Sequence, residues 1–210
     1  MQDFSLARRT MVDNQLRPQG VTDRRVLDAM GKVERERFVP EASRPFAYFD
    51  RAVRIGQGRS LMPPAALGRL LTEAGPRPGE RALVVGSGTG YSAAVLREIG
   101  LEVVALESDQ LLAADAQAAD IETVVGTLRD GWSKGAPYQL ILLEGAVEEV
   151  PAAFAKQLAT GGRIVGAIID RGVARLSVGT SASGSIGWRS LADSDVEALP
   201  GFERPRAFTF

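Results

Sequence analysis

The residues best suited to hold a ligand lie between Arg81 and Glu107. An apolar run at 82–85 leads into the turn Gly86-Ser87-Gly88-Thr89-Gly90, and the helix-prone stretch 91–99 follows. A second apolar run, 103–106, ends at Glu107. The predicted order is strand, glycine turn, helix, strand and acid. Such a unit binds a nucleoside at the carboxyl ends of parallel strands.

Each residue type in this stretch has a physical use. Gly86 and Gly88 let the turn tighten and let a ligand approach bare backbone, and Gly90 lets the helix pack close to the strand. Glu107 can accept hydrogen bonds from two ribose hydroxyls. We therefore expect a cofactor to bind between Ser87, Gly88 and Glu107, with Ser108 beside them.

The spacing of the glycines indicates which cofactor binds. It is G-x-G-x-G rather than the G-x-G-x-x-G of pyrophosphate binders, and no Gly-Lys-Ser/Thr of a P-loop is present. The tighter turn suits S-adenosylmethionine, which has a cationic methionine tail and no phosphate. The alternative is a purely structural glycine turn in another α/β protein. The glycine spacing also disfavours an NAD-dependent oxidoreductase.

Composition excludes several other classes of function. The chain has 210 residues, a net charge of −1, no cysteine and no histidine. Thiolate and histidine-base mechanisms are excluded, no metal site is predicted, and a nucleic-acid surface built on bulk positive charge is disfavoured. No apolar stretch reaches transmembrane length, and the N-terminus does not resemble a signal peptide. We expect a cytoplasmic protein with no membrane or nucleic-acid partner.

The remaining pattern predicts one α/β domain. Strands expected at 82–85, 103–106, 122–125, 140–143 and 164–168 alternate with helices, which requires a parallel, Rossmann-like sheet with right-handed crossovers. Strands without intervening helices, at 173–178, 185–191 and 207–210, predict an antiparallel C-terminal edge. We divide the single domain into an N-terminal helical layer with the active-site loop (1–75), a cofactor-binding core (76–170) and C-terminal strands (171–210).

The N-terminal layer is expected to contain three helices and a long loop. Residues 5–16 predict the first helix, and Thr22 is a plausible N-cap of the second. Residues 36–41 and 47–50 are expected to form an irregular lid over the sheet edge. A loop at 55–64 then leads into a helix at 65–74.

The chain resembles the protein-L-isoaspartate O-methyltransferase family over nearly its whole length. The residues that carry the resemblance are Arg37-Phe38-Val39-Pro40, Ala47-Tyr48-Phe49-Asp50, Ile55-Gly56, Val85-Gly86-Ser87-Gly88-Thr89-Gly90-Tyr91, Ala136-Pro137-Tyr138, Glu149-Val150-Pro151 and Gly161-Gly162-Arg163. The resemblance implies a seven-stranded sheet and methyl transfer from S-adenosylmethionine to the α-carboxylate of isoaspartyl residues. That transfer begins the repair of aged proteins through succinimide formation.

Three site positions depart from the family pattern. In the family's Gln-Thr-Ile-Ser-x-Pro loop the Ser is catalytic, whereas Met62 stands at that position here and Ser60 at the threonine. The family's Gly-Asp-Gly after the third strand, whose Asp contacts adenine, is replaced by Gly126-Thr127-Leu128. Thr127 and Leu128 should therefore flank the adenine. After the fourth strand, Glu144 replaces a small residue.

These departures leave the roles of the loop residues open. A serine hydroxyl can orient the acceptor carboxylate, and Met62 cannot donate such a hydrogen bond. Ser60 could supply the donor, and Arg59 could hold the carboxylate with two parallel hydrogen bonds. The competing readings are an apolar gap-filling role for Met62 and solvated loop charges for Arg59 and Glu144.

We expect a carboxyl methyltransferase acting on isoaspartyl peptides or proteins, weak or altered in substrate. The candidate catalytic residues are Arg59, Ser60 and Met62, and the candidate cofactor residues are Gly86, Ser87, Gly88, Gly90, Glu107, Ser108, Thr127, Leu128 and Glu144. The alternative is a binding module that keeps the cofactor pocket but has lost catalysis. The sequence does not determine the oligomeric state.

Overall fold

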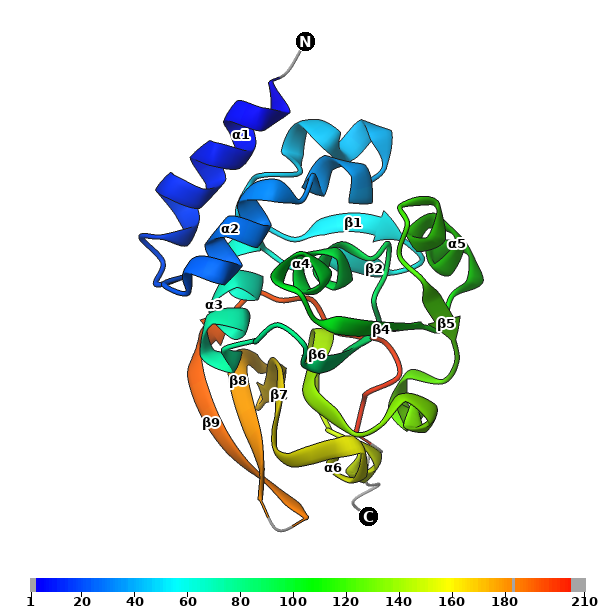
Figure 1. Ribbon diagram of the computed structural model, residues 1–210. Coiled ribbons are helices and arrows are strands. Elements are labelled where there is room, and N and C mark those ends of the chain that lie inside the picture. The colour runs from blue at the N-terminus through cyan, green and yellow to red at the C-terminus, as the bar shows by residue number, and fades with distance from the viewer. Residues whose placement is uncertain (1–2, 183, 205–210) are drawn as a thin grey trace.

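A mixed sheet forms the centre of the molecule (Figure 1). The computed structural model describes residues 3–182 and 184–204. Within these residues seven strands form one sheet in the order β5-β4-β3-β6-β7-β8-β9. The strands are β3 (Arg81–Val85), β4 (Glu102–Glu107), β5 (Thr123–Val125), β6 (Tyr138–Val147), β7 (Leu158–Asp170), β8 (Val173–Ala182) and β9 (Ser185–Ser194). The predicted α/β fold with a sheet of about seven strands is confirmed.

The strands from β3 to β7 are parallel, and each is joined to the next by helical segments. These segments are α4 (Tyr91–Ile99), α5 (Gln110–Ala118), the short η4 (Leu128–Asp130) and η5 (Ser133–Gly135), and α6 (Ala152–Gln157). β3 lies between β4 and β6, so the carboxyl ends of these strands meet where the chain order reverses. Ligands of such sheets bind at that point. α4 has the bounds of the helix-prone stretch 91–99, and it ends at the glycine C-cap Gly100, which has a φ of 104°.

Alternation along the strands divides the core into two layers. Ala82 and Val84 pack with the N-terminal helices and with α3 to α5, whereas Leu83 and Val85 pack with α6 and the C-terminal segment. Successive side chains of a strand point to opposite faces, which is why one apolar run can serve both layers. On β6, Leu140 and Leu142 face the first layer.

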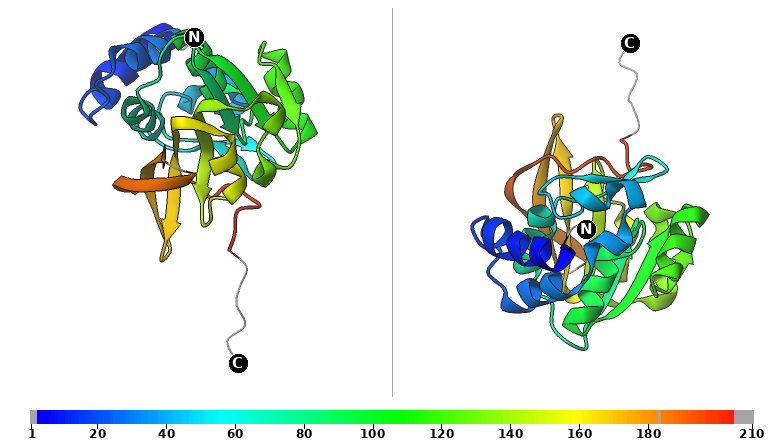
Figure 2. Two further views of the ribbon diagram at one scale, coloured as in Figure 1. Left: turned by 60° about the horizontal axis from the view of Figure 1, so that its bottom comes forward. Right: turned by 90° about the horizontal axis from the view of Figure 1, so that it is seen from above.

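The N-terminal layer covers one face of the sheet. It comprises α1 (Phe4–Met11), the π-helical η1 (Val12–Leu16), α2 (Arg24–Lys32), η2 (Arg35–Phe38), η3 (Glu41–Phe46), β1 (Val53–Gly56), β2 (Arg59–Leu61) and α3 (Pro64–Ala74). α2 packs against α3 and α4, as the view from above in Figure 2 also shows. Residues from α1, η1 and α2 share one apolar core with sheet residues.

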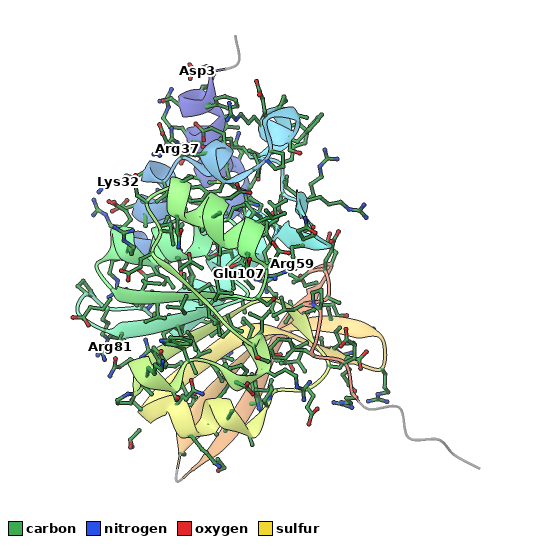
Figure 3. All side chains as sticks on the ribbon, turned by 90° about the vertical axis from the view of Figure 1, so that its right-hand side faces the viewer. Asp3, Lys32, Arg37, Arg59, Arg81 and Glu107 are labelled. Carbon is green, nitrogen blue, oxygen red and sulfur yellow. The ribbon has the colours of Figure 1, made fainter. Side chains whose placement is uncertain are left out.

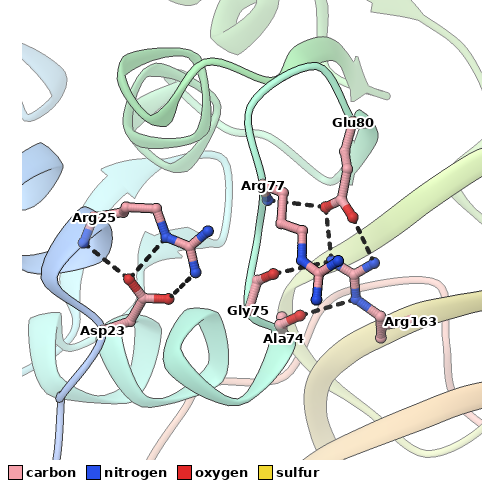
Figure 4. Close-up of polar contacts among 7 residues, drawn as sticks. All are labelled: Asp23, Arg25, Ala74, Gly75, Arg77, Glu80 and Arg163. Carbon is pink, nitrogen blue, oxygen red and sulfur yellow. Dashed lines mark hydrogen bonds and ion pairs between the residues drawn. The ribbon is translucent and has the colours of Figure 1, made fainter.

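Two local predictions in this layer are wrong. The N-cap of α2 is Asp23 rather than Thr22, because an Asp23 Oδ1 accepts from the Arg25 amide at 2.9 Å (Figure 4). The predicted loop at 55–64 instead contains the β1–β2 hairpin. Its turn residues Gln57 and Gly58 have φ values of 52° and 67°. Positive φ at both positions is typical of a type I′ hairpin turn.

The C-terminal edge is antiparallel, as predicted, because β8 pairs with β7 and β9 pairs with β8. Both strands run further than expected, to Ala182 and Ser194. The strand expected at 207–210 lies outside the described residues. After β9, Ala198 returns to form a parallel bridge with Ala146 of β6.

An ion pair holds the amino-terminal side of the sheet together (Figure 4). Arg163 of β7 donates to both carboxylate oxygens of Glu80, at 3.0 and 2.7 Å, and to the Ala74 carbonyl at the end of α3, at 2.9 Å. Arg163 and Glu80 are largely buried. This contact fixes α3 and the approach to β3 against β7.

Candidate active site

Glu107 is fully buried at the carboxyl end of β4 and is the most heavily hydrogen-bonded residue of the site. Its Oε2 accepts from the Gly88 amide at 2.8 Å, and its Oε1 accepts from the amides of Ser108 and Asp109 at 2.7 and 3.1 Å. These bonds tie the glycine turn to the end of β4. The carboxylate therefore has a fixed position beside the turn, where the sequence predicts a ribose acceptor.

Arg59 reaches the same carboxylate from β2, as Figure 3 shows. Its Nη1 donates to Glu107 Oε1 at 2.9 Å, and its Nη2 donates to the Gly86 carbonyl. The exposed fractions of the two side chains are 7% and 0%, so the pair is buried. The reading of Arg59 as a solvated loop charge is wrong, because β2 places it inside the site.

The glycine turn has the backbone that its sequence requires. Gly86, Gly88 and Gly90 have φ values of 72°, 55° and 96°, in the region where side chains are strained. A Cβ on Gly86 would lie 2.6 Å from Nη2 of Arg59, and one on Gly88 would lie 2.6 Å from Cδ1 of Ile55. In the same turn, the buried Ser87 Oγ has no hydrogen-bond partner among the described residues.

A groove of about 460 Å³ opens beside the ends of β4 and β5. It brings together Ser108, Thr127 and Leu128, three of the predicted cofactor residues. Pro200 and Gly201 also line it, and sequence reasoning did not identify them. Its mixed apolar and hydroxyl lining, next to Glu107, suits the adenine end of a nucleoside.

The predicted catalytic loop lines a separate, small cavity of about 10 Å³, roughly the room that one water molecule requires. Arg59, Ser60, Met62 and Glu144 all contribute to its wall. Met62 is buried, with an exposed fraction of 2%. The Ser60 hydroxyl donates to Glu197 Oε2 at 2.8 Å. The structure therefore brings the loop residues together with Glu144.

Glu144 follows Leu140 and Leu142 on the face of β6 that carries the N-terminal layer. Its exposed fraction is 3%, and neither carboxylate oxygen has a hydrogen-bond partner in the described part of the chain. Burial raises the pKa of Glu144. The Ser92 hydroxyl and the Met62 amide, which lie near the carboxylate without meeting hydrogen-bond geometry, and the charges of Arg35 and Arg59 act in the opposite direction. The reading of Glu144 as a solvated loop acid is wrong.

A second buried charge, Arg35, lies behind Glu144. Its guanidinium is fully buried and lies 4.6 Å from the ring centroid of Tyr91. Its Nε and Nη2 donate to the carbonyls of Ala47 and Met62, both at 2.7 Å. Burial lowers the pKa of Arg35, and the nearby Tyr91 and Glu144 oppose that shift. Arg35 thus holds the backbone at Met62 in place.

The C-terminal segment 196–202 completes the site. No local pattern in the sequence of this segment predicts that it lies there. Ala146 donates to the Glu197 carbonyl at 2.8 Å, and the Leu199 amide donates to the Ala146 carbonyl at 2.7 Å. A Cβ on Gly86 would lie 2.8 Å from the Leu199 side chain. Residues more than 50 positions apart therefore meet beside the glycine turn, and only the folded chain brings them together.

Comparisons with known proteins show which family the chain resembles. The model of the protein-L-isoaspartate(D-aspartate) O-methyltransferase family matches residues 7–184. The chain is 42% identical over 165 residues to protein-L-isoaspartate O-methyltransferase 2 of Anaeromyxobacter sp. (strain Fw109-5), covering 75% of this chain and 68% of the relative. It is also 42% identical over 173 residues to protein-L-isoaspartate O-methyltransferase 2 of Marinobacter nauticus, covering 78% of each.

Two solved structures share the fold. A protein-L-isoaspartate O-methyltransferase superimposes with a TM-score of 0.79 at 22% identity, covering 92% of this chain and 66% of that one. A putative enzyme of the same name from Plasmodium falciparum, in complex with S-adenosyl-L-homocysteine, gives 0.76 at 20% identity, covering 95% and 99%. With the family model matching most of its length, the chain belongs to the protein-L-isoaspartate O-methyltransferase family.

Proposed function

We propose that this chain transfers a methyl group from S-adenosylmethionine to the α-carboxylate of L-isoaspartyl residues and so begins their repair. Membership of the family supports the activity. The observation that best supports binding of the cofactor is the position of Glu107, which is buried at the end of β4 and fixed by the Gly88 amide of the glycine turn. The comparisons supply no observation in favour of a binding module without catalysis.

The residues present fit this cofactor. The groove beside Ser108 and Leu128 suits adenine, Glu107 suits the ribose hydroxyls, and the unpartnered Ser87 Oγ and bare glycine backbone suit the methionine tail. When bound, the cofactor supplies a methyl group activated by its positively charged sulfur. Glu107 orients the ribose, and the turn keeps side chains away from the tail.

The acceptor needs to be positioned rather than activated. An isoaspartyl carboxylate is already ionised at neutral pH, so the absence of histidine is no obstacle. Correct placement of two reactants can supply several kcal/mol of the barrier. We assign that placement to Arg59, at the wall of the cavity that Ser60, Met62 and Glu144 share.

We further propose that the substrates are damaged proteins of the cytoplasm. Among the described residues, no helix has the length and apolar character needed to span a membrane. No cluster of residues able to hold a metal ion occurs in that part of the chain either.

One experiment tests the proposed function. A peptide with a single isoaspartyl residue and its normal aspartyl twin are incubated with the protein and methyl-labelled S-adenosylmethionine. We expect label in the isoaspartyl peptide alone. Equal labelling of the two peptides, or none in either, would contradict the proposal.

A further inference from the structure

Arg59 uses two acceptors that a bound cofactor would also need. Its Nη1 donates to the carboxylate of Glu107, which suits ribose hydroxyls, and its Nη2 donates to the Gly86 carbonyl, which suits an ammonium group. Both groups that it bridges are buried. One guanidinium thus spans the positions expected for the ribose and for the amino end of the methionine tail.

Arg59 and such a ligand cannot occupy these positions together. Nη2 lies so close to the turn that a single added Cβ on Gly86 would be 2.6 Å from it. Oε1 of Glu107 already accepts from Arg59 and from the amides of Ser108 and Asp109. A ribose hydroxyl that binds this oxygen would therefore replace Arg59.

The structure also indicates where a displaced Arg59 can go. The cavity at the catalytic loop shares Arg59 with Ser60, Met62 and Glu144. Glu144 has two buried carboxylate oxygens without a hydrogen-bond partner among the described residues. A guanidinium that turned toward this cavity could pair with Glu144 by one edge. Its other edge would remain free to bind a carboxylate with two parallel hydrogen bonds.

We propose that Arg59 is a positioning residue that exchanges partners: it pairs with Glu107 in the free protein and moves to the acceptor subsite when a ribose takes Glu107. This inference rests on the proposed function, which supplies both ligands. It explains how a carboxylate could bind beside Glu144, whose negative charge would otherwise repel it. Binding of the cofactor would then create the anion site for the substrate, so each ligand strengthens binding of the other.

The wild-type protein provides the first test. The affinity of a fluorescent isoaspartyl peptide is measured by anisotropy with and without saturating S-adenosylhomocysteine, which has no methyl group to transfer. We expect the peptide to bind at least tenfold more tightly when S-adenosylhomocysteine is present. The same affinity in both conditions would overturn the exchange.

Variants identify Arg59 as the cause. By calorimetry, Arg59→Gln should bind S-adenosylhomocysteine at least tenfold more tightly than wild type, because no buried ion pair has to be broken. Its peptide affinity should no longer depend on S-adenosylhomocysteine. Arg54→Gln removes a charge from the exposed face of the same hairpin and should match wild type in both measurements. Weaker or unchanged binding in Arg59→Gln would contradict the proposal.

Two further arms keep the outcomes separate. If Arg59→Gln does not fold, Arg59→Lys replaces it. This variant keeps the charge but lacks the guanidinium that forms two parallel hydrogen bonds, so its peptide affinity should depend on S-adenosylhomocysteine less than that of wild type. Methylation of the peptide without any effect of S-adenosylhomocysteine on its affinity would overturn the exchange and leave the proposed function standing. If the peptide is neither methylated nor bound, both the exchange and the proposed function are overturned.

Discussion

At the scale of single residues, Glu107 joins local structure to ligand binding. It fixes the glycine turn through the Gly88 amide, and we propose that the same carboxylate binds the ribose hydroxyls of the cofactor. We predict that Glu107→Ala weakens binding of S-adenosylhomocysteine at least tenfold, since hydrogen bonds to a charged group contribute about 1.5–3 kcal/mol. Calorimetry measures this. Glu102→Ala, an exposed acid at the other end of β4, is the control, and equal affinities in all three proteins would remove Glu107 from the site.

A substitution of Met62 tests how the protein positions the acceptor carboxylate. We predict that Met62→Ser raises the turnover of isoaspartyl peptide tenfold or more, with little change in cofactor affinity, because a hydroxyl fixes a near-attack geometry that ground-state binding hardly needs. Steady-state kinetics at saturating cofactor measure the gain. Ser60 does not supply this hydroxyl here, because it donates to Glu197.

The opposite result for Met62 would also be informative. A fast wild-type rate that falls in Met62→Ser would mean that the loop has another solution. Ser60→Ala should then abolish activity, because Ser60 would have exchanged Glu197 for the substrate.

Glu144 gives a prediction about pH. Its raised pKa means that the folded protein binds the proton more tightly than the unfolded chain, so the charged carboxylate lowers stability as pH rises above the unfolded value. Glu144→Gln should therefore be more stable than wild type at pH 7, by about 1 kcal/mol, the usual scale of single substitutions. This difference should disappear below pH 4.5, the ordinary pKa of a glutamate side chain.

Urea unfolding of both proteins at several pH values measures the difference. A less stable Glu144→Gln at pH 7 would mean that Glu144 acts as the charged counterion of the buried Arg35. The sign of the change therefore separates the two roles of this carboxyl.

At the scale of elements, the Arg163–Glu80 pair joins β7 to α3 and to the approach to β3 (Figure 4). We predict that Arg163→Met lowers the free energy of unfolding by about 2 kcal/mol, the scale of hydrogen bonds to charged groups. Burial opposes ionisation of Glu80, but the hydrogen bonds from Arg163 and from the Arg77 amide prevail and lower its pKa.

The pKa of Glu80 also determines how the destabilisation by Arg163→Met changes with pH. Because the folded pKa of Glu80 is depressed, its stabilisation is present above the ordinary glutamate pKa of 4.5 and is lost as pH falls through the folded pKa. The cost of Arg163→Met should therefore shrink in acid. Arg81→Met, at an exposed ion pair with Glu102, is the control and should cost less than about 1 kcal/mol. Equal costs for the two variants would contradict the assignment.

Sequence patterns predict the elements well where the signal is local. Apolar runs predict the parallel strands, and the helix-prone stretch 91–99 matches the bounds of α4. The β1–β2 hairpin was missed although Gln57-Gly58 carries a turn signal, because its strands are only four and three residues long. That miss matters, since β2 places Arg59 on Glu107 instead of in solvent.

At the scale of the whole molecule, the site depends on contacts that local patterns do not encode. The pairing of Ala146 with Ala198 brings Leu199 to the glycine turn and Pro200 to the groove. The burial of Glu144 likewise results from the N-terminal layer closing over β6. The proposed cofactor residues can be predicted from a sequence motif, whereas the walls of the proposed acceptor cavity depend on tertiary structure.

The central claim is that this assembly begins the repair of isoaspartyl residues, and conversion of the peptide tests it most directly. An isoaspartyl peptide is incubated with the protein and excess S-adenosylmethionine, and its aspartyl twin is followed by chromatography. We predict that the aspartyl twin accumulates over repeated methylation cycles, and more slowly with Glu107→Ala. An isoaspartyl peptide that remains unchanged after many equivalents of S-adenosylmethionine have been consumed would contradict the claim.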